Sequence, residues 1–176
     1  MRRPLRTLIF IPLLLGTAFF SPLSYKPFLC GGLLQLYCLQ DYSLPPSLGK
    51  DMILHHILTQ WLTLGIMCYP QLPWEYVQVF INTEYSTFPL IFRDLGISHS
   101  INSLVFIITF TYFRIFQLGK LIFHLILKNE LWSLPFLMSV PVTGLYAINL
   151  YWYYKIGRLF SRIHLLPRFR HLNNRT

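Results

Sequence analysis

Six apolar runs, each close to membrane length and bounded by prolines, glycines or charged residues, limit what this chain can fold into. A helix needs about 20 apolar residues to cross the hydrocarbon of a bilayer. Only 12% of the residues are charged and 54% are hydrophobic, whereas soluble domains carry about 25% charged residues. The pattern predicts an all-α fold, a polytopic transmembrane helical bundle of about six spans. The apolar runs cover residues 8–23, 28–44, 52–69, 76–92, 101–127 and 131–154.

The formal net charge of +9 comes mainly from basic residues at the two ends of the chain. These residues form no basic binding face, so nucleic acid is not an expected partner. Short basic flanks beside apolar spans mark the cytosolic side of a membrane, so both termini are predicted to be cytosolic, which requires an even number of spans. Because the first two runs are the weakest spans, a bundle of four to five spans with an interfacial N-terminal segment is the alternative.

The sequence divides into three regions. Residues 1–30 hold the basic N-terminal flank and the first hydrophobic segment, residues 31–158 form the transmembrane domain, and residues 159–176 form a basic cytosolic tail. No internal repeat or low-complexity tract is evident, so a single polytopic domain is expected.

Two adjacent histidines, His55 and His56, lie inside the third apolar run. Ionisable side chains are costly in hydrocarbon and persist there mainly when they face a bundle interior or a cavity. Neighbouring positions on a helix project about 100° apart, so we expect one histidine to contact substrate and the other to be structural. Adjacent histidines chelate a metal poorly, and no third ligand occurs at a standard spacing. No metal and no cofactor is predicted.

A polar stretch in the fourth run supplies a carboxylate partner, Glu84. If the third and fourth runs form an antiparallel hairpin, Glu84 lies about five residues, or roughly 7 Å, deeper than the histidines. A tilt of the hairpin, or one bridging water, would bring these groups together. A histidine–carboxylate set can act as a general acid–base unit, so His55, His56 and Glu84 are the candidate catalytic residues. The alternative is that they satisfy one another and hold the bundle together.

Three further charged residues are candidate lipid-binding residues. Arg114 lies deep in the fifth run among aromatic side chains. It is expected to pair with a lipid headgroup or with an acid such as Glu84, or else to extend its charged end to the membrane surface. Asp51 and Arg93 fall at similar depth near one membrane face, where they are expected to pair.

The polar and aromatic elements of the chain follow one another in a recognisable order. They are Asp41, His55-His56-Ile-Leu-Thr59, Asn82-Thr-Glu84-Tyr-Ser86-Thr87-Phe-Pro-Leu-Ile-Phe-Arg93, Phe110-Thr-Tyr-Phe113-Arg114 and Asn149-Leu-Tyr-Trp152-Tyr-Tyr-Lys155. In this order and spacing they resemble the TLC-domain family of polytopic membrane proteins, which includes the ceramide synthases and several non-synthase members. The resemblance covers roughly residues 31–158.

The resemblance implies an all-helical membrane bundle, usually in the endoplasmic reticulum, that works on lipids. In the ceramide synthases the histidine pair lies in the catalytic cavity, where an acyl chain passes from acyl-CoA to a sphingoid amine. By this resemblance His55 and His56 would be catalytic and acyl-CoA a co-substrate. The synthases carry a histidine–aspartate pair in their next motif, whereas residues 79–87 here contain Glu84 and no such pair. This stretch looks more like the Glu-x-Ser/Thr pattern of the non-synthase branch.

Three functions stay open at the level of sequence. The first is lipid handling or membrane lipid homeostasis by a multi-pass protein, with or without chemistry. The second is acyl-CoA-dependent N-acylation of sphingoid bases. The third is the role of a non-enzymatic membrane adaptor or cargo receptor. Membrane lipids are the expected partners, together with other membrane proteins or a second copy of the chain, and the endoplasmic reticulum membrane is the expected location.

Overall fold

The computed structural model describes residues 3–22, 25–42, 49–69 and 72–173. The described residues form helices and contain no strand, which confirms the all-α prediction. In chain order the elements are α1 (Arg3–Phe20), α2 (Lys26–Tyr42), α3 (Lys50–Cys68), α4 (Trp74–Asn82), η1 (Thr83–Ser86), α5 (Thr87–Asp94), α6 (His99–Phe110), η2 (Thr111–Gln117), α7 (Leu118–Leu127), α8 (Glu130–Ser133) and α9 (Phe136–Asn173).

The helices follow the six apolar runs, because α4, η1 and α5 form one continuous stretch and α6, η2 and α7 form another. The breaks occur where the backbone needs left-handed residues. Gly96 has φ +82° just after α5, and Asn129 has φ 59° just after α7. The sixth run does not start as one helix: the short α8 precedes Pro135, and α9 begins after it and continues without interruption to Asn173.

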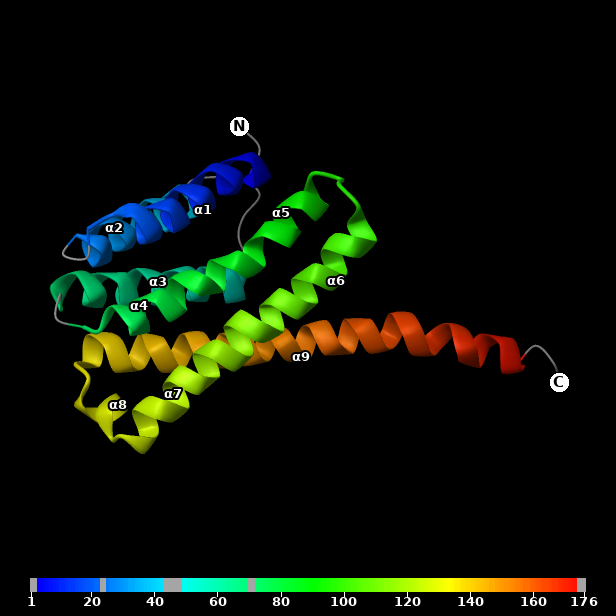
Figure 1. Cartoon of the computed structure of the whole chain (residues 1–176). Coiled ribbons are helices and arrows are strands. Elements are labelled where there is room, and N and C mark those ends of the chain that lie inside the picture. Colours follow the sequence, from blue (N-terminus) through cyan, green and yellow to red (C-terminus); the bar gives the residue numbers. More distant parts are fainter. Residues whose placement is uncertain (1–2, 23–24, 43–48, 70–71, 174–176) are drawn as a thin grey trace.

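Helix α3 lies between α2 and α9, while α5 packs against α6 (Figure 1). Glycines let α3 and α9 approach closely, as small residues do between membrane helices. A Cβ atom at Gly65 would lie 2.9 Å from the Leu137 carbonyl oxygen, and one at Gly144 would lie 2.9 Å from Leu58 Cδ1. Helices α3 and α4 are consecutive and antiparallel, as expected, but the extensive contacts of α3 are with α2 and α9. The inner part of the site described below is lined by residues from both α3 and α4.

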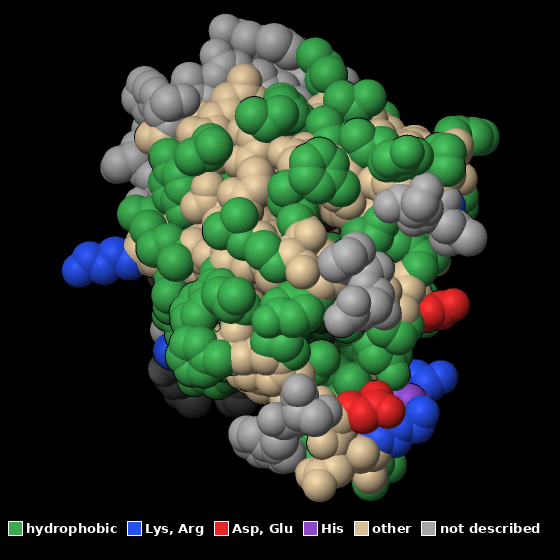
Figure 2. Space-filling view, turned by 90° about the vertical axis from the view of Figure 1, so that its left-hand side faces the viewer, with side chains coloured by type: hydrophobic (Ala, Val, Ile, Leu, Met, Phe, Trp, Pro, Cys, Tyr) green, Lys and Arg blue, Asp and Glu red, His purple; other side chains and the backbone are tan. Residues whose placement is uncertain are grey.

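The apolar residues divide between a core and an exposed hydrophobic surface. Side chains such as Ile81, Leu118 and Met138 are buried, yet many large hydrophobic side chains are exposed, Phe116 at 68% among them. In the described part of the chain one helix, residues 100–127, is long and apolar enough to cross a membrane, and only 17% of its most apolar window is buried. Most of this window therefore faces outward and not into the bundle. The face in Figure 2 is likewise mostly hydrophobic, with charged side chains at its margins.

Candidate functional site

Two of the long helical stretches depart from α-helical geometry in their middle. In one, the 3₁₀ segment η1 carries Glu84, and in the other, the π-helical segment η2 carries Arg114. Such segments inside long helices often mark functional positions or hinges. The two segments contact each other, so the irregular parts of both helices meet at one place inside the bundle.

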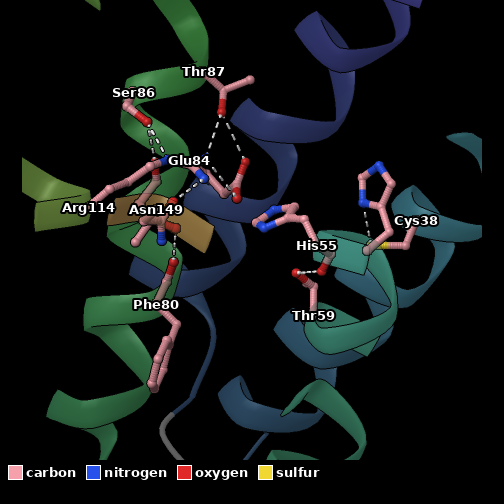
Figure 3. A network of polar contacts seen from close by, with 11 residues as sticks. Cys38, His55, Thr59, Phe80, Glu84, Ser86, Thr87, Arg114 and Asn149 are labelled. Atoms are coloured by element: carbon pink, nitrogen blue, oxygen red, sulfur yellow. Dashed lines mark hydrogen bonds and ion pairs between the residues drawn. The ribbon is translucent and has the colours of Figure 1, made fainter. Parts of the chain in front are cut away.

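The Arg114 guanidinium is held by side chains from three elements (Figure 3). Its Nε donates to Ser86 Oγ at 2.8 Å, and its Nη1 donates to Asn149 Oδ1 at 3.4 Å. Its Nη2 donates to Thr87 Oγ1 at 3.4 Å and lies 3.7 Å from Glu84 Oε1. Thr87 Oγ1 in turn donates to Glu84 Oε2 at 3.2 Å. The guanidinium and the carboxylate are therefore joined both directly and through one hydroxyl group.

These contacts decide between the two interpretations of Arg114. The side chain is only 7% exposed, so the expectation that it extends to the membrane surface is wrong. A buried guanidinium is stable only when charge and hydrogen-bond partners surround it. Glu84 supplies the charge, while Ser86, Thr87 and Asn149 supply acceptors.

His55 faces this pair from α3, with its ring turned toward Glu84 (Figure 3). The residue is partly buried, and its ring lies 5.0 Å from the Trp152 ring, centroid to centroid. Its Nδ1 atom is buried and has no hydrogen-bond partner among the described residues. A buried polar atom without a partner is uncommon and costly, which makes this nitrogen a candidate contact for a bound molecule.

His56 lies in a different environment, on the seam between α2 and α3. Its Nε2 lies 3.2 Å from Asp41 Oδ2, and its Nδ1 lies 3.4 Å from Cys38 Sγ. The rings of Tyr37 and Tyr42 meet the His56 ring edge-on. With 3% exposure and both ring nitrogens engaged, His56 joins two helices.

Two cavities meet at the polar residues. We call the first the inner chamber; it measures about 40 Å³ and is enclosed by α2, α3, α4, α7 and α9. We call the second the vestibule; it measures about 330 Å³ and is lined largely by apolar side chains, including Met52, Leu90, Phe106, Phe110 and Ile156. His55, Glu84 and Arg114 line both cavities. We call these three residues the neck.

Asp51 and Lys155 lie just outside the apolar runs, at the outer end of the vestibule. Trp152 Nε1 donates to Asp51 Oδ2 at 3.0 Å, and Lys155 Nζ donates to the same oxygen at 3.1 Å. The Trp152 hydrogen bond, followed by the Lys155 hydrogen bond, lowers the pKa of Asp51. The described contacts of Asp51 go to α9, and its expected pairing with Arg93 stays a prediction. Arg93 lies in α5, and its side chain is outside the described ones.

Four of the six candidate residues line the vestibule, His55, His56, Glu84 and Arg114, and all of them except His56 also line the inner chamber. Sequence reasoning assigned no site role to Ser86 and Thr87, although two hydroxyl side chains two and three positions after Glu84 in an apolar run were a usable signal. The carboxamide of Asn149, only 2% exposed, is a further missed member of the network.

Comparison with known proteins gives one result. The family model described as the TLC domain matches residues 17–158, which is most of the chain. No curated protein and no solved structure matches significantly. The match includes every residue of the neck and its supporting network. It agrees with the resemblance carried by the histidine pair, the polar stretch around Glu84 and the segment that contains Arg114. The chain belongs to the TLC-domain family, a family of membrane-associated proteins.

Proposed function

We propose that this chain is a multi-pass membrane protein of lipid handling that binds one lipid molecule in the vestibule, with polar atoms of the lipid at the neck. The six helical stretches, α8 excepted, then cross the bilayer. Both termini lie in the cytosol because basic residues flank the outer spans. Residence in the endoplasmic reticulum follows from family membership and is part of the proposal.

The observation that carries this proposal is the partnerless Nδ1 atom of His55 at the end of a ligand-sized cavity. Sites for small molecules measure about 300–1,000 Å³ and combine apolar walls with a few convergent polar groups. The vestibule has this size and this kind of wall. The ligand would use the free His55 nitrogen together with the charged groups of Glu84 and Arg114.

The size of the inner chamber restricts how a lipid is placed. A cavity needs about 10–15 Å³ to hold one water molecule, so the inner chamber, at about 40 Å³, has room for a few waters and not for an acyl chain. The acyl chain therefore occupies the vestibule and stops at the neck. In Figure 1 the starts of α1 and α3 and the turn from α5 to α6 lie at one end of the bundle. The vestibule reaches toward this end, which is the proposed cytosolic side.

A second candidate function, acyl transfer to a sphingoid amine, is favoured by the geometry of His55 and Glu84 at one neck. A free imidazole nitrogen can accept the proton of an attacking amine while the new N–C bond forms and the thioester C–S bond of acyl-CoA breaks. Lipid handling ranks first because the stretch that contains Glu84 lacks the synthase histidine–aspartate pair.

The test is the lipid profile of cells that lack ceramide synthases and express matched amounts of the wild-type chain or of His55→Ala, His56→Ala or Thr143→Ala. Thr143 is an exposed control whose hydroxyl bonds only to its own helix among the described residues. A shift in phospholipid acyl composition that depends on His55 supports lipid handling. A new N-acylated sphingoid product that depends on His55 establishes the transferase instead. Identical lipid profiles from all four chains would contradict both lipid handling and acyl transfer, and would leave the adaptor function.

A further inference from the structure

A third cavity, separate from the inner chamber and the vestibule, lies between α4 and α7. It shares no lining residue with either of them. It measures about 460 Å³, and we call it the polar groove. Six of its nine lining residues carry polar or charged side chains. Its residues are Glu75, Tyr76, Gln78, Val79, Asn82, Gln117, Lys120, Leu121 and His124.

Three carboxamides face the polar groove within the apolar runs: Gln78, Asn82 and Gln117. The Oε1 atom of Gln117 is buried and has no hydrogen-bond partner among the described residues. In hydrocarbon no water is available to satisfy such an atom, and carboxamides there pair with groups on a neighbouring helix. Contact between this groove and lipid is thus unfavourable, because its carboxamides would lack hydrogen-bond partners. A polar partner would supply these hydrogen bonds.

The charges of the groove point to one particular partner. Exposed Glu75 lies at the start of α4, and exposed Lys120 and His124 lie one turn apart on α7. The structure shows no ion pair for Glu75 or Lys120 with a described residue. One wall of the groove is therefore acidic and the other basic.

We propose that the polar groove is the contact surface between two copies of this chain, related by a two-fold axis along the membrane normal. In such a contact the same surface is used by both copies. Helix α4 of one copy faces α7 of the other, so each Glu75 meets the other copy's Lys120. A carboxamide is both donor and acceptor, which lets Gln78 and Asn82 of one copy pair with Gln117 of the other. This proposal is independent of the lipid proposal.

Cross-linking in native membranes tests the proximity. Because Cys30 and Cys38 are buried and Cys68 is exposed, Cys68→Ser provides the background for single cysteines at Gln78 and at Ile108. Ile108 is an exposed apolar control on α6, outside the groove. A bis-maleimide should join Gln78→Cys into an adduct of twice the 20.9 kDa chain and leave Ile108→Cys monomeric. No adduct at Gln78→Cys, or an adduct with a different protein, would overturn the proposal.

Charge reversal tests the pairing itself. Glu75→Lys alone and Lys120→Glu alone should each weaken association, because like charges then face each other across the axis. Two differently tagged chains, one with Glu75→Lys and one with Lys120→Glu, should associate again when they are co-expressed, since both contacts are then opposite in charge. Failure of the mixed pair to associate would contradict the two-fold arrangement. Gln117→Leu should raise the dissociation constant about 3- to 20-fold, the range for one hydrogen bond between membrane helices.

Discussion

Two neighbouring histidines on α3 both line the vestibule, but they differ in the partners of their ring nitrogens. His56 is 3% exposed and has Asp41 and Cys38 of α2 at hydrogen-bonding distance. His55 lies at the neck, where its Nδ1 has no partner among the described residues and a cavity of about 330 Å³ begins. The two residues are adjacent on one helix, yet the His56 side chain joins α2 to α3, whereas the His55 side chain has a ring nitrogen available to a ligand.

This difference shows how a helical bundle can combine stability with an open polar site. A buried group whose hydrogen bonds are all made contributes to stability, and a buried group that lacks one lowers it. His56, at the contact between α2 and α3, is a group of the first kind, whereas His55 is a group of the second kind. Substitutions at the two positions should therefore affect different quantities, and the predictions below run from the largest expected effect to the smallest.

The largest effect is expected at the neck, from Arg114→Leu. The substitution leaves the Glu84 carboxylate buried without its cation, and breaking a buried ion pair from one side costs about 3–5 kcal/mol. The thermal midpoint of the purified protein in detergent, followed by light scattering, should fall sharply, together with the amount of protein that accumulates.

The double variant Glu84→Gln/Arg114→Met separates charge burial from the packing of the neck. Neutral replacement of a buried ion pair is often harmless to stability, so this variant should have a thermal midpoint near that of the wild type while it no longer binds lipid. A double variant as unstable as Arg114→Leu would contradict the assignment of Glu84 as the counter-ion.

The next effect is expected on the seam, from His56→Ala. It removes the contact with Asp41 and the packing against Tyr37 and Tyr42. Hydrogen bonds to charged groups contribute about 1.5–3 kcal/mol, so the free energy of unfolding should fall by about this amount. Denaturation in detergent measures it, and lipid bound per folded molecule should stay at the wild-type level.

His55→Phe should have the opposite profile. It keeps an aromatic ring against Trp152 and removes the buried nitrogen that has no partner, whose cost is about 1–3 kcal/mol. Stability should be unchanged or higher, as thermal unfolding will show, and lipid binding should be lost. A clear loss of stability in His55→Phe would mean that His55, like His56, is a structural residue.

The smallest effect is expected at the outer end of the vestibule, from Asp51→Asn. Because hydrogen bonds from Trp152 and Lys155 lower the pKa of Asp51 in the folded protein, its carboxylate contributes to stability above the pKa of the unfolded chain, about 3.9. This contribution is lost as the pH falls through the folded-state pKa. The variant should thus unfold slightly earlier than the wild type at neutral pH, and the difference should shrink below about pH 4 and disappear once the pH is below the folded-state pKa. A difference that persists there would show that packing, and not charge, is responsible.

The helical extents could be predicted from the sequence because hydropathy reports directly on what solvates each segment. The apolar runs at 52–69 and 101–127 correspond closely to α3 and to the stretch from α6 to α7. Packing partners could not be predicted in this way, since many side-chain arrangements satisfy the same hydropathy. The third and fourth runs form the expected antiparallel hairpin, but the extensive contacts of α3 are with α9, through Gly65 and Gly144, and with α2, through Gly31.

The composition of the site was also only partly predictable. Glu84 and Arg114 were visible as charges in apolar runs, and each was a candidate on that ground. The 3₁₀ and π segments that carry them leave no clear mark in the sequence, because they alter the helical turn over only 4 and 7 residues. The partner of Asp51 was missed for a related reason: Trp152 and Lys155 are about 100 residues away in the chain, and only the fold brings them together.

The most direct test of this account is native mass spectrometry of the protein released from its own membranes, with lipid occupancy and thermal midpoint measured for His55→Phe and His56→Ala. Thr143→Ala serves as the control. The account predicts that His55→Phe loses the bound lipid at an unchanged or raised thermal midpoint, and that His56→Ala keeps the lipid at a lowered midpoint. The reverse assignment, or equal lipid occupancy in all the chains, would contradict the claim that the neck is a lipid site.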